Sequence, residues 1–239
     1  SQSRRYSPEI SAFRDALAEL GGAAQLHADF FQNPRFGGFR DEMAHPLLID
    51  MAIHAFDQAR FVLGVDPVSV FCDEFNPPWS WYVSGASATA VFTFEQGQRF
   101  TYVGSWCADG LTTSWNAGWR GVAPEGSAIW DGERAVEFER RAGGRTSVPV
   151  SSAREGIVAS LDEFLAFLDG GPTASGEVHS NIWSLAMVEA AVMSAESGER
   201  VDFTDVFSRA HEVAVSGGEP DVIAVIASWP AAHPPRLSP

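Results

Sequence analysis

Apolar residues recur at helical spacing between Pro46 and Gly64. The stripe consists of Leu47, Leu48, Met51, Ala52, Ala55, Phe56, Ala59, Val62 and Leu63. Proline suits the first turn of a helix, and glycine suits the residue just past its end. The pattern therefore predicts a helix over 46–63 with one wide apolar face that must be buried.

The same periodicity predicts four further helices. The first covers 8–20, with Ser7 as its N-cap and Pro8 in its first turn. The others follow late in the chain, over 157–168, from 179 or 180 to 197, and over 204–216. Helices are therefore expected near both ends of the chain.

Alternation of apolar and polar residues replaces the helical period in the middle of the chain. Strands are predicted over 23–32, 68–72, 86–95, 99–107, 114–122, 127–130 and 135–141, and loops over 33–44 and 142–155. Short strands joined by tight turns, such as Gln96-Gly97, favour an antiparallel sheet. Such a sheet buries one face against helices and leaves the other for solvent or a partner.

The predicted fold is therefore α+β, with an open, predominantly antiparallel sheet and helices on one face. One domain is expected over 1–216. The residues 217–239 are expected to form a C-terminal tail that is partly disordered, ending in a Pro-rich stub over 234–239.

Charge excludes several functions. The formal net charge is −15, which argues against nucleic acid and anionic membranes as partners. All 16 basic residues are arginines, so no lysine can form a Schiff base or a P-loop. No Gly-x-Gly-x-x-Gly follows a strand, and no motif has the spacing of metal ligands, so neither a cofactor-binding nor a metal-binding residue is predicted.

The expected location is the cytoplasm. No apolar run is long enough to cross a membrane, and the first residues lack the apolar core of a signal peptide. Cys72 and Cys107 stand far apart in strand-like runs, which favours two buried thiols over a disulfide framework.

Asp50 and His54 are the first candidate catalytic residues. They stand four apart in the predicted helix and so share one face of it. A carboxylate one turn before an imidazole can orient the ring and raise its basicity, as a general base requires. The alternative is an ordinary surface Asp–His pair, and spacing alone does not exclude it.

Four further residues are candidates for substrate binding. His179 opens a predicted helix beside Asn181, although a histidine at that position can equally be a capping or surface residue. Trp79 and Trp81 interrupt the strand pattern after two prolines, and indole faces stack well on sugar rings. The alternative for either tryptophan is a core or subunit contact.

The chain resembles the Gfo/Idh/MocA oxidoreductases, the family of glucose–fructose oxidoreductase and inositol dehydrogenase. The resemblance starts from Asp50-Met-Ala-Ile-His54, an Asp-x-x-x-His segment. It continues through Arg4-Arg-Tyr6, Gly126-Ser127 and the segment from Asn181 to Gly198, and so covers nearly the whole chain. One departure is His45-Pro46, which stands where many members have Gly-Gly.

The resemblance implies a specific half of a two-domain enzyme. Members combine an N-terminal Rossmann domain that binds NAD or NADP with a C-terminal α+β domain that contacts substrate and other subunits. This chain resembles the second half alone, with the Rossmann domain absent. The resemblance implies that His54 is the acid/base group for a sugar or polyol hydroxyl, with Asp50 orienting it.

Two hypotheses follow. The first is the substrate-binding domain of an NAD(P)-dependent sugar or polyol dehydrogenase, which forms a homodimer or homotetramer through its sheet face and needs a Rossmann domain or subunit. A fragment, a split enzyme and a descendant without redox chemistry all fit it. The second is a non-enzymatic carbohydrate-binding or dimerisation module. Cofactor-free acid/base chemistry by His54 is a further alternative.

Overall fold

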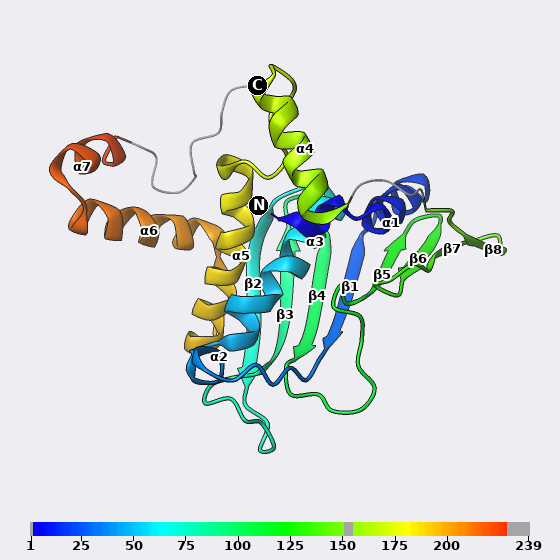
Figure 1. Ribbon diagram of the computed structural model, residues 1–239, viewed down its shortest axis with the longest axis horizontal. Coiled ribbons are helices and arrows are strands. Elements are labelled where there is room, and N and C mark those ends of the chain that lie inside the picture. Colours follow the sequence, from blue (N-terminus) through cyan, green and yellow to red (C-terminus); the bar gives the residue numbers. More distant parts are fainter. Residues whose placement is uncertain (1, 151–154, 229–239) are drawn as a thin grey trace.

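The computed structural model describes residues 2–150 and 155–228 of the chain, and this part contains one nine-stranded sheet (Figure 1). Its order is β8-β7-β6-β5-β1-β4-β3-β2-β9. The strands are β1 (Gln25–Phe31), β2 (Pro67–Phe75), β3 (Ser87–Phe94), β4 (Arg99–Ser105), β5 (Gly118–Ala123), β6 (Gly126–Trp130), β7 (Val136–Arg140), β8 (Arg145–Ser147) and β9 (Val201–Asp202). The pair β1–β4 is parallel and every other pair is antiparallel, which confirms the predicted open and mostly antiparallel sheet.

Most helices of the described residues lie on one face of this sheet, whereas the last two extend beyond its edge (Figure 1). They are η1 (Ser3–Tyr6), α1 (Pro8–Glu19), α2 (Phe39–Glu42), η2 (Leu47–Ala52), α3 (Ile53–Leu63), α4 (Gly156–Leu168), α5 (Val178–Ser197), α6 (Phe203–Gly217) and α7 (Pro220–Ile226). In Figure 1, α3 and α5 lie in front of the sheet near β2 and β3, and α1 lies in front of β5 and β6. None of these helices is long and apolar enough to cross a membrane.

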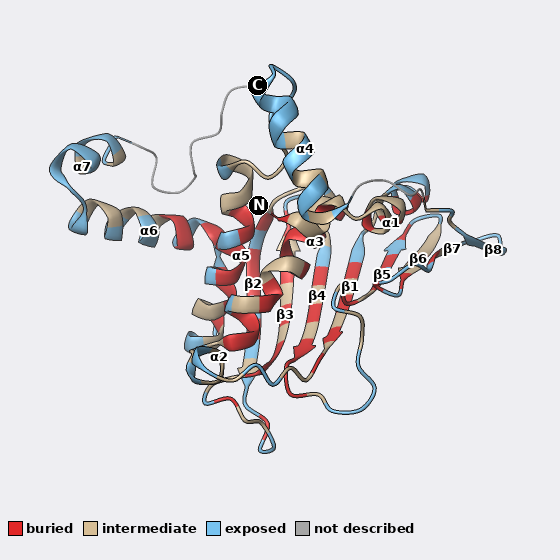
Figure 2. Ribbon diagram, viewed as in Figure 1, coloured by how far each residue is buried: buried red, intermediate tan, exposed pale blue. Residues whose placement is uncertain are grey.

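Strand alternation divides the sheet into a buried and an open face. On β1, Leu26, Ala28 and Phe30 are buried, whereas His27 and Asp29 are only half-buried. Figure 2 shows the buried residues concentrated where α3 and α5 meet the strands. The predicted packing of helices on one face is therefore confirmed.

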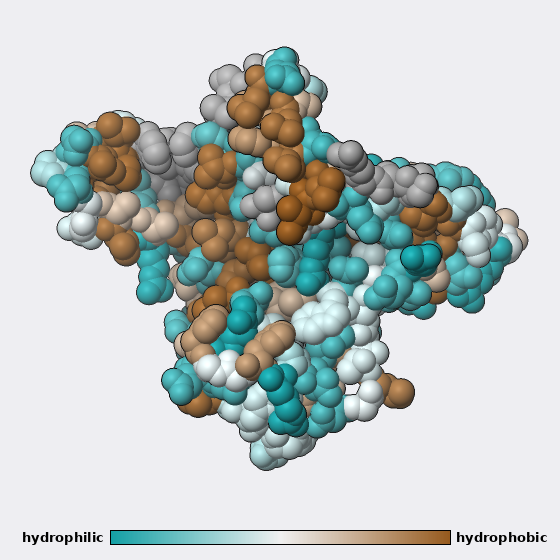
Figure 3. Space-filling model, viewed as in Figure 1, coloured by the Kyte–Doolittle hydropathy of each residue, from teal (hydrophilic) through white to brown (hydrophobic). Residues whose placement is uncertain are grey.

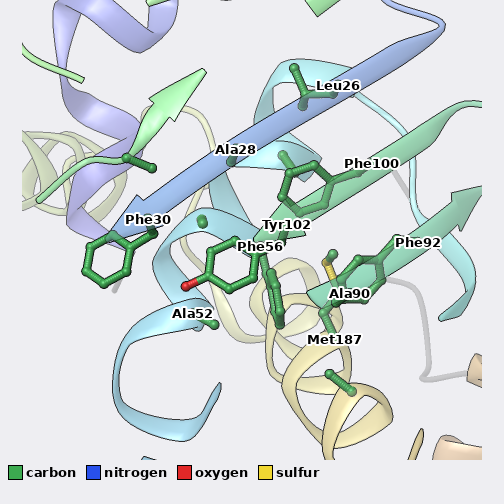
Figure 4. Close-up of a cluster of buried hydrophobic side chains, with 14 of the residues drawn as sticks. Leu26, Ala28, Phe30, Ala52, Phe56, Ala90, Phe92, Phe100, Tyr102 and Met187 are labelled. Carbon is green, nitrogen blue, oxygen red and sulfur yellow. The ribbon is translucent and has the colours of Figure 1, made fainter. Parts of the chain in front are cut away.

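Aromatic rings form the centre of the core (Figure 4). Phe56 on α3 contacts three rings of the sheet edge-on, with centroid distances of 4.8 Å to Phe92, 6.3 Å to Phe100 and 5.4 Å to Tyr102. Phe100 in turn stacks on Trp119, at 5.8 Å. Edge-to-face and stacked pairs of this kind add about 0.5–1.5 kcal/mol each beyond simple burial. They fix α3, and hence the residues at its start, against the sheet.

The predicted helix over 46–63 exists, but it begins with a turn of a different kind. Residues Leu47–Ala52 form a π-helix, and the α-helical part begins only at Ile53. A π-helical turn spaces its hydrogen bonds five residues apart, which the apolar periodicity cannot reveal. The predicted end of the helix is confirmed, since Gly64 has a φ of 67° and caps it.

Several boundaries differ from the prediction. The predicted loops at 33–44 and 142–155 contain the short elements α2 and β8, and the strand predicted from 114 begins at Gly118. The helix α6 runs to Gly217 and α7 covers Pro220–Ile226 within the predicted tail, while the division into a domain over 1–216 and a tail over 217–239 stays a prediction. The stub over 234–239 lies outside the described residues. Cys72 and Cys107 are buried free thiols, as predicted.

Candidate functional site

The π-helix η2 and the first turn of α3 present the two predicted catalytic residues. Before them, His45 has a φ of 49°, in the left-handed region that favours glycine. Its ring pairs through Nδ1 with the buried carboxylate of Glu74. This pairing fixes the start of the helix at a position where the resembling family often has glycine.

Asp50 is half-buried and accepts a hydrogen bond from Nε of Arg40, at 2.7 Å. Among the described residues, no hydrogen bond joins Asp50 to His54. The negative charge of Asp50 raises the pKa of His54. This effect is smaller than that of Asp57, which acts in the same direction, and smaller than those of burial and Arg4, which lower the pKa. In this geometry Asp50 acts on His54 through its charge.

His54 is half-buried, and its Nδ1 atom is buried with no hydrogen-bond partner in the described part of the chain. Burial lowers the pKa of His54 to about 4, and the nearby charge of Arg4 lowers it further, against smaller opposing effects of Asp57 and Asp50. The imidazole is consequently neutral near pH 7. With Nδ1 turned inward, Nε2 on the opposite edge is the nitrogen available to accept a proton from a ligand.

Arg4 reaches this histidine from η1, and sequence reasoning did not assign it a role. Its Nη1 atom donates to the backbone carbonyl of Trp115, and Nη2 lies 3.8 Å from the sulfur of Met51. The charge of Arg4 also acts on Tyr102, whose hydroxyl is buried and has no hydrogen-bond partner within residues 2–150 and 155–228. Residues 4, 54, 102 and 115 are remote in sequence, so only the fold brings them together.

A buried ionic network fixes η1 against α3 and α5. Arg5 donates through Nε to Oδ2 of Asp57 at 3.0 Å and through Nη2 to Oδ1. The hydroxyl of Ser184 on α5 also donates to Oδ1 of Asp57, at 2.7 Å. Asp57 is only 1% exposed. Asp57, which the sequence places on the same helix edge as His54, therefore fixes η1 against α3 and α5.

His179 and Asn181 lie at the start of α5. The side chain of Glu177 caps this helix by accepting hydrogen bonds from the backbone of His179 and Ser180, and it also contacts Nδ1 of His179 at 2.8 Å. The N-cap of α5 is therefore Glu177, and both the backbone and the ring of His179 contact its carboxylate. The amide oxygen of Asn181 is buried without a partner among the described residues.

Trp79 and Trp81 lie in the loop between β2 and β3. Trp79 is 66% exposed, with its Nε1 donating to the carbonyl of Cys107 at 2.9 Å. The guanidinium of Arg35 lies 3.8 Å above the ring of Trp81. Within the described residues, no hydrogen bond joins His54 to Trp79 or Trp81.

A series of aromatic rings nevertheless links Trp81 to the surroundings of His54. Successive ring contacts of 5.3–6.4 Å run from Trp81 through Tyr82, Trp106 and Phe36 to Trp115. Trp115 is 43% exposed and is the residue whose carbonyl binds Arg4. One wall of the candidate site is thus aromatic and partly open to solvent.

The described residues contain no group of three or more His, Cys, Asp or Glu side chains that could hold a metal ion. The site therefore offers a neutral imidazole, a desolvated guanidinium and an aromatic wall. A neutral imidazole can take a proton from a hydroxyl, and aromatic faces bind the C–H faces of sugars. The fold and site together define an α+β domain with a half-buried imidazole near a partly exposed aromatic wall.

Residues 16–121 match the model of the family described as GFO/IDH/MocA C-terminal domain, and this part of the chain is such a domain. It contains Asp50, His54, Trp79 and Trp81, whereas Arg4 and His179 lie outside it. The chain is also 27% identical over 233 residues to the protein y4oX of Sinorhizobium fredii (strain NBRC 101917 / NGR234), covering 90% of this chain and 64% of that protein.

Solved structures show the same fold. An oxidoreductase from Agrobacterium radiobacter in complex with NAD+, L-tartaric acid and magnesium superposes with a TM-score of 0.73 and 20% identity, over 85% of this chain and 64% of that one. An aldose-aldose oxidoreductase from Caulobacter crescentus complexed with glycerol gives 0.67 and 18%, over 84% and 62%. The chain thus spans less than two thirds of the length of each of these relatives.

Proposed function

We propose that this chain is the substrate-binding domain of an NAD(P)-dependent oxidoreductase that acts on a sugar or polyol hydroxyl, with His54 as the acid/base group. The observation that carries the proposal is a half-buried, neutral imidazole at the start of α3 in a GFO/IDH/MocA C-terminal domain. The bound NAD+ and L-tartaric acid of the Agrobacterium relative support redox chemistry on a hydroxylated small molecule.

The chain's own residues do not fit a nucleotide. The sequence has no Gly-x-Gly-x-x-Gly after a strand and no lysine. NAD or NADP, held by a separate nucleotide-binding domain, would supply the hydride acceptor. In this chain, Nε2 of His54 takes the hydroxyl proton as the carbon loses its hydride, and the charge of Asp50 favours the resulting imidazolium.

The helix α4 fits the surface on which that nucleotide-binding domain docks. Every large apolar residue of α4 is at least 41% exposed; these residues are Ile157, Val158, Leu161, Phe164, Leu165, Phe167 and Leu168. Such an apolar patch marks an interaction site (Figure 3). Tyr6 of η1 bonds to Glu163 of α4, so α4 adjoins the same turn as Arg4. A domain docked there would approach His54.

The substitution Leu161→Glu places a charge on α4 and is expected to abolish the association of this chain with the nucleotide-binding domain. Sedimentation measures that association, and an unchanged association would exclude α4 as the docking surface.

The open face of the sheet fits a second copy of the chain. One row across it runs through Phe71, Val91, Thr101, His27 and Arg120, with half-buried or exposed side chains of mixed polarity. A flat, partly apolar sheet of this kind suits an isologous dimer. Sedimentation equilibrium of the purified chain should give a dimer or tetramer, and a monomer at all concentrations would exclude this face as a strong interface.

Turnover of the complete enzyme tests the role of His54. In an assembly of this chain with its nucleotide-binding domain, His54→Ala should lower kcat by about 100- to 10,000-fold. His211→Ala, which removes a histidine of α6 outside both the candidate site and the open face, is the matched control and should leave kcat unchanged. Normal turnover of His54→Ala would show that His54 is not the acid/base group.

The alternative function is a non-enzymatic carbohydrate-binding module, which the 66% exposure of Trp79 favours. That function predicts that sugar binding survives His54→Ala but is lost in Trp79→Ala. Calorimetric titration of both variants with the same sugar separates the two functions. Loss of binding in His54→Ala with full binding in Trp79→Ala would favour the enzyme.

A further inference from the structure

Arg4 is the one arginine of the candidate site whose guanidinium has no carboxylate partner among the described residues. Three other arginines, one next to Arg4 in sequence and two on the helices α2 and α3, are each paired with an aspartate: Arg5 with Asp57, Arg40 with Asp50, and Arg60 with Asp66. Arg4 instead contacts a backbone carbonyl and a methionine sulfur, which are neutral. One positive charge at this site is therefore uncompensated.

Keeping this charge is costly. Burial lowers the pKa of Arg4 to about 10, because a cation loses hydration when it is surrounded by protein. A buried charge is normally paired, and an unpaired one destabilises the folded state. The position is nevertheless held firmly, because the adjacent Arg5 is fixed by Asp57 and Tyr6 bonds to Glu163 and Ser175. Arg4 is thus preorganised toward His54 without an internal counter-ion.

We propose that Arg4 binds an anionic group of the substrate, so that the substrate is an acidic polyol carrying a carboxylate or a phosphate. This proposal rests on the proposed function in one respect, which is that His54 meets a hydroxyl of the same substrate molecule. A guanidinium presents a planar set of donors that matches both anions. Binding of the anion would supply the missing counter-charge.

The surroundings of Arg4 can accommodate such a molecule. Arg4 lies on the wall of an open cavity of about 780 Å³ together with Asn116 and Arg134. Three carboxylates, Glu9, Glu133 and Glu155, also line this cavity, and two of them already accept hydrogen bonds, Glu9 from Ser7 at 2.5 Å and Glu133 from Ser114 at 2.6 Å. His54 is not among the lining residues, but Arg4 lies close enough to it for its charge to lower the pKa of His54. The exposed ring of Trp115 adjoins Arg4 and offers an apolar face to the carbon chain of a polyol.

A pair of probes that differ mainly in charge tests the proposal. D-gluconate and D-glucitol have the same six-carbon chain, with a carboxylate at one end of the first and a hydroxymethyl group in the second. D-glucitol 6-phosphate adds the phosphate case. Binding of each probe to the purified chain is measured by calorimetry or by NMR titration at pH 7 and low salt, in wild type, Arg4→Gln and the control Arg14→Gln.

At least one anionic probe should bind wild type about 10- to 100-fold more tightly than glucitol, as expected for a charge-assisted hydrogen bond. The preference should disappear in Arg4→Gln and persist in Arg14→Gln. Tighter binding of gluconate would indicate a carboxylate on the substrate, and tighter binding of glucitol 6-phosphate would indicate a phosphate.

Arg4→Gln should unfold at the same urea concentration as wild type or at a higher one, because it removes an unpaired charge. Marked destabilisation would instead indicate a structural role for Arg4.

Equal binding of charged and neutral probes, or a preference that survives Arg4→Gln, would overturn the proposal. If glucitol still binds and His54→Ala weakens it, the proposed function stands while the role of Arg4 fails. In another outcome, His54→Ala leaves the affinity for every probe unchanged while Arg4→Gln abolishes the preference for the anion. The anion site at Arg4 then stands, and the role of His54 fails. Absence of binding by all three probes would overturn both.

Discussion

The protonation of His54 gives a direct test of the site, through the pH dependence of stability. We compare wild type with His54→Gln, which keeps a side chain of similar polarity but cannot titrate. Burial, followed by the charge of Arg4, lowers the pKa of His54 from an ordinary 6.5 to about 4 in the folded protein. In the unfolded chain the histidine returns to its ordinary pKa.

The sign and size of the effect follow from linkage. Between pH 6.5 and 4 the unfolded chain binds a proton at this histidine and the folded protein does not, so stability falls as the pH falls. Above pH 6.5 neither state is protonated and the effect is absent. The difference of about 2.5 pH units, at 1.36 kcal/mol per unit, gives a loss of about 3 kcal/mol by pH 4 that His54→Gln should not share.

Urea denaturation followed by tryptophan fluorescence, at half-unit steps from pH 7.5 to 4, measures the free energy of unfolding of both proteins. Other titrating groups cancel in the difference between them. Adding Arg4→Gln should raise the pKa of His54 and reduce the loss, since the charge of Arg4 contributes to the shift. A difference that does not change with pH, or an imidazole that titrates near 6.5 by NMR, would refute the buried, neutral His54.

Two further predictions use matched pairs of variants and the same urea measurement. Asp57→Asn should cost about 3–5 kcal/mol because it breaks a buried ion pair, whereas Asp15→Asn, at an exposed pair, should cost less than about 1 kcal/mol. Gly121→Ala should cost about 1–3 kcal/mol of stability, because its Cβ would lie 2.6 Å from two methyl carbons of Leu17. Gly118→Ala on the same strand is the control: its Cβ meets nothing within 4 Å, and it should change stability by at most about 0.5 kcal/mol. Equal effects within either pair would contradict the packing described here.

The fold was largely predictable because its elements are strongly patterned. The stripe from Leu47 to Leu63 and the alternation around Phe92 and Phe100 each carry enough apolar periodicity to define an element. Elements that lack a period could not be predicted in this way. The turn η1, the four residues of α2 and the π-helical start at Leu47 are set by tertiary contacts and backbone hydrogen bonding.

The candidate site was predictable only where its residues share one element. Spacing placed Asp50 and His54 on one helix, and the family resemblance gave His54 a role. Spacing could not show that Asp50 pairs with Arg40 across a loop, or that Arg4 approaches His54 from fifty residues away. The segment Arg4-Arg-Tyr6 was visible as part of the resemblance, but its physical role depends on contacts that only the fold provides.

The contrast between Arg4 and Arg5 explains why this turn matters to the site. Both are buried or half-buried cations on consecutive residues, yet one has a bidentate carboxylate and the other has none. Stability alone does not explain Arg4, because an apolar residue of similar size could pack at this position without losing the hydration of a charge. The paired arginine fixes the turn, and the unpaired one thereby presents a charge to the space next to His54. If Arg4 and His54 have the roles proposed above, this arrangement selects a ligand by charge before the proton transfer at His54.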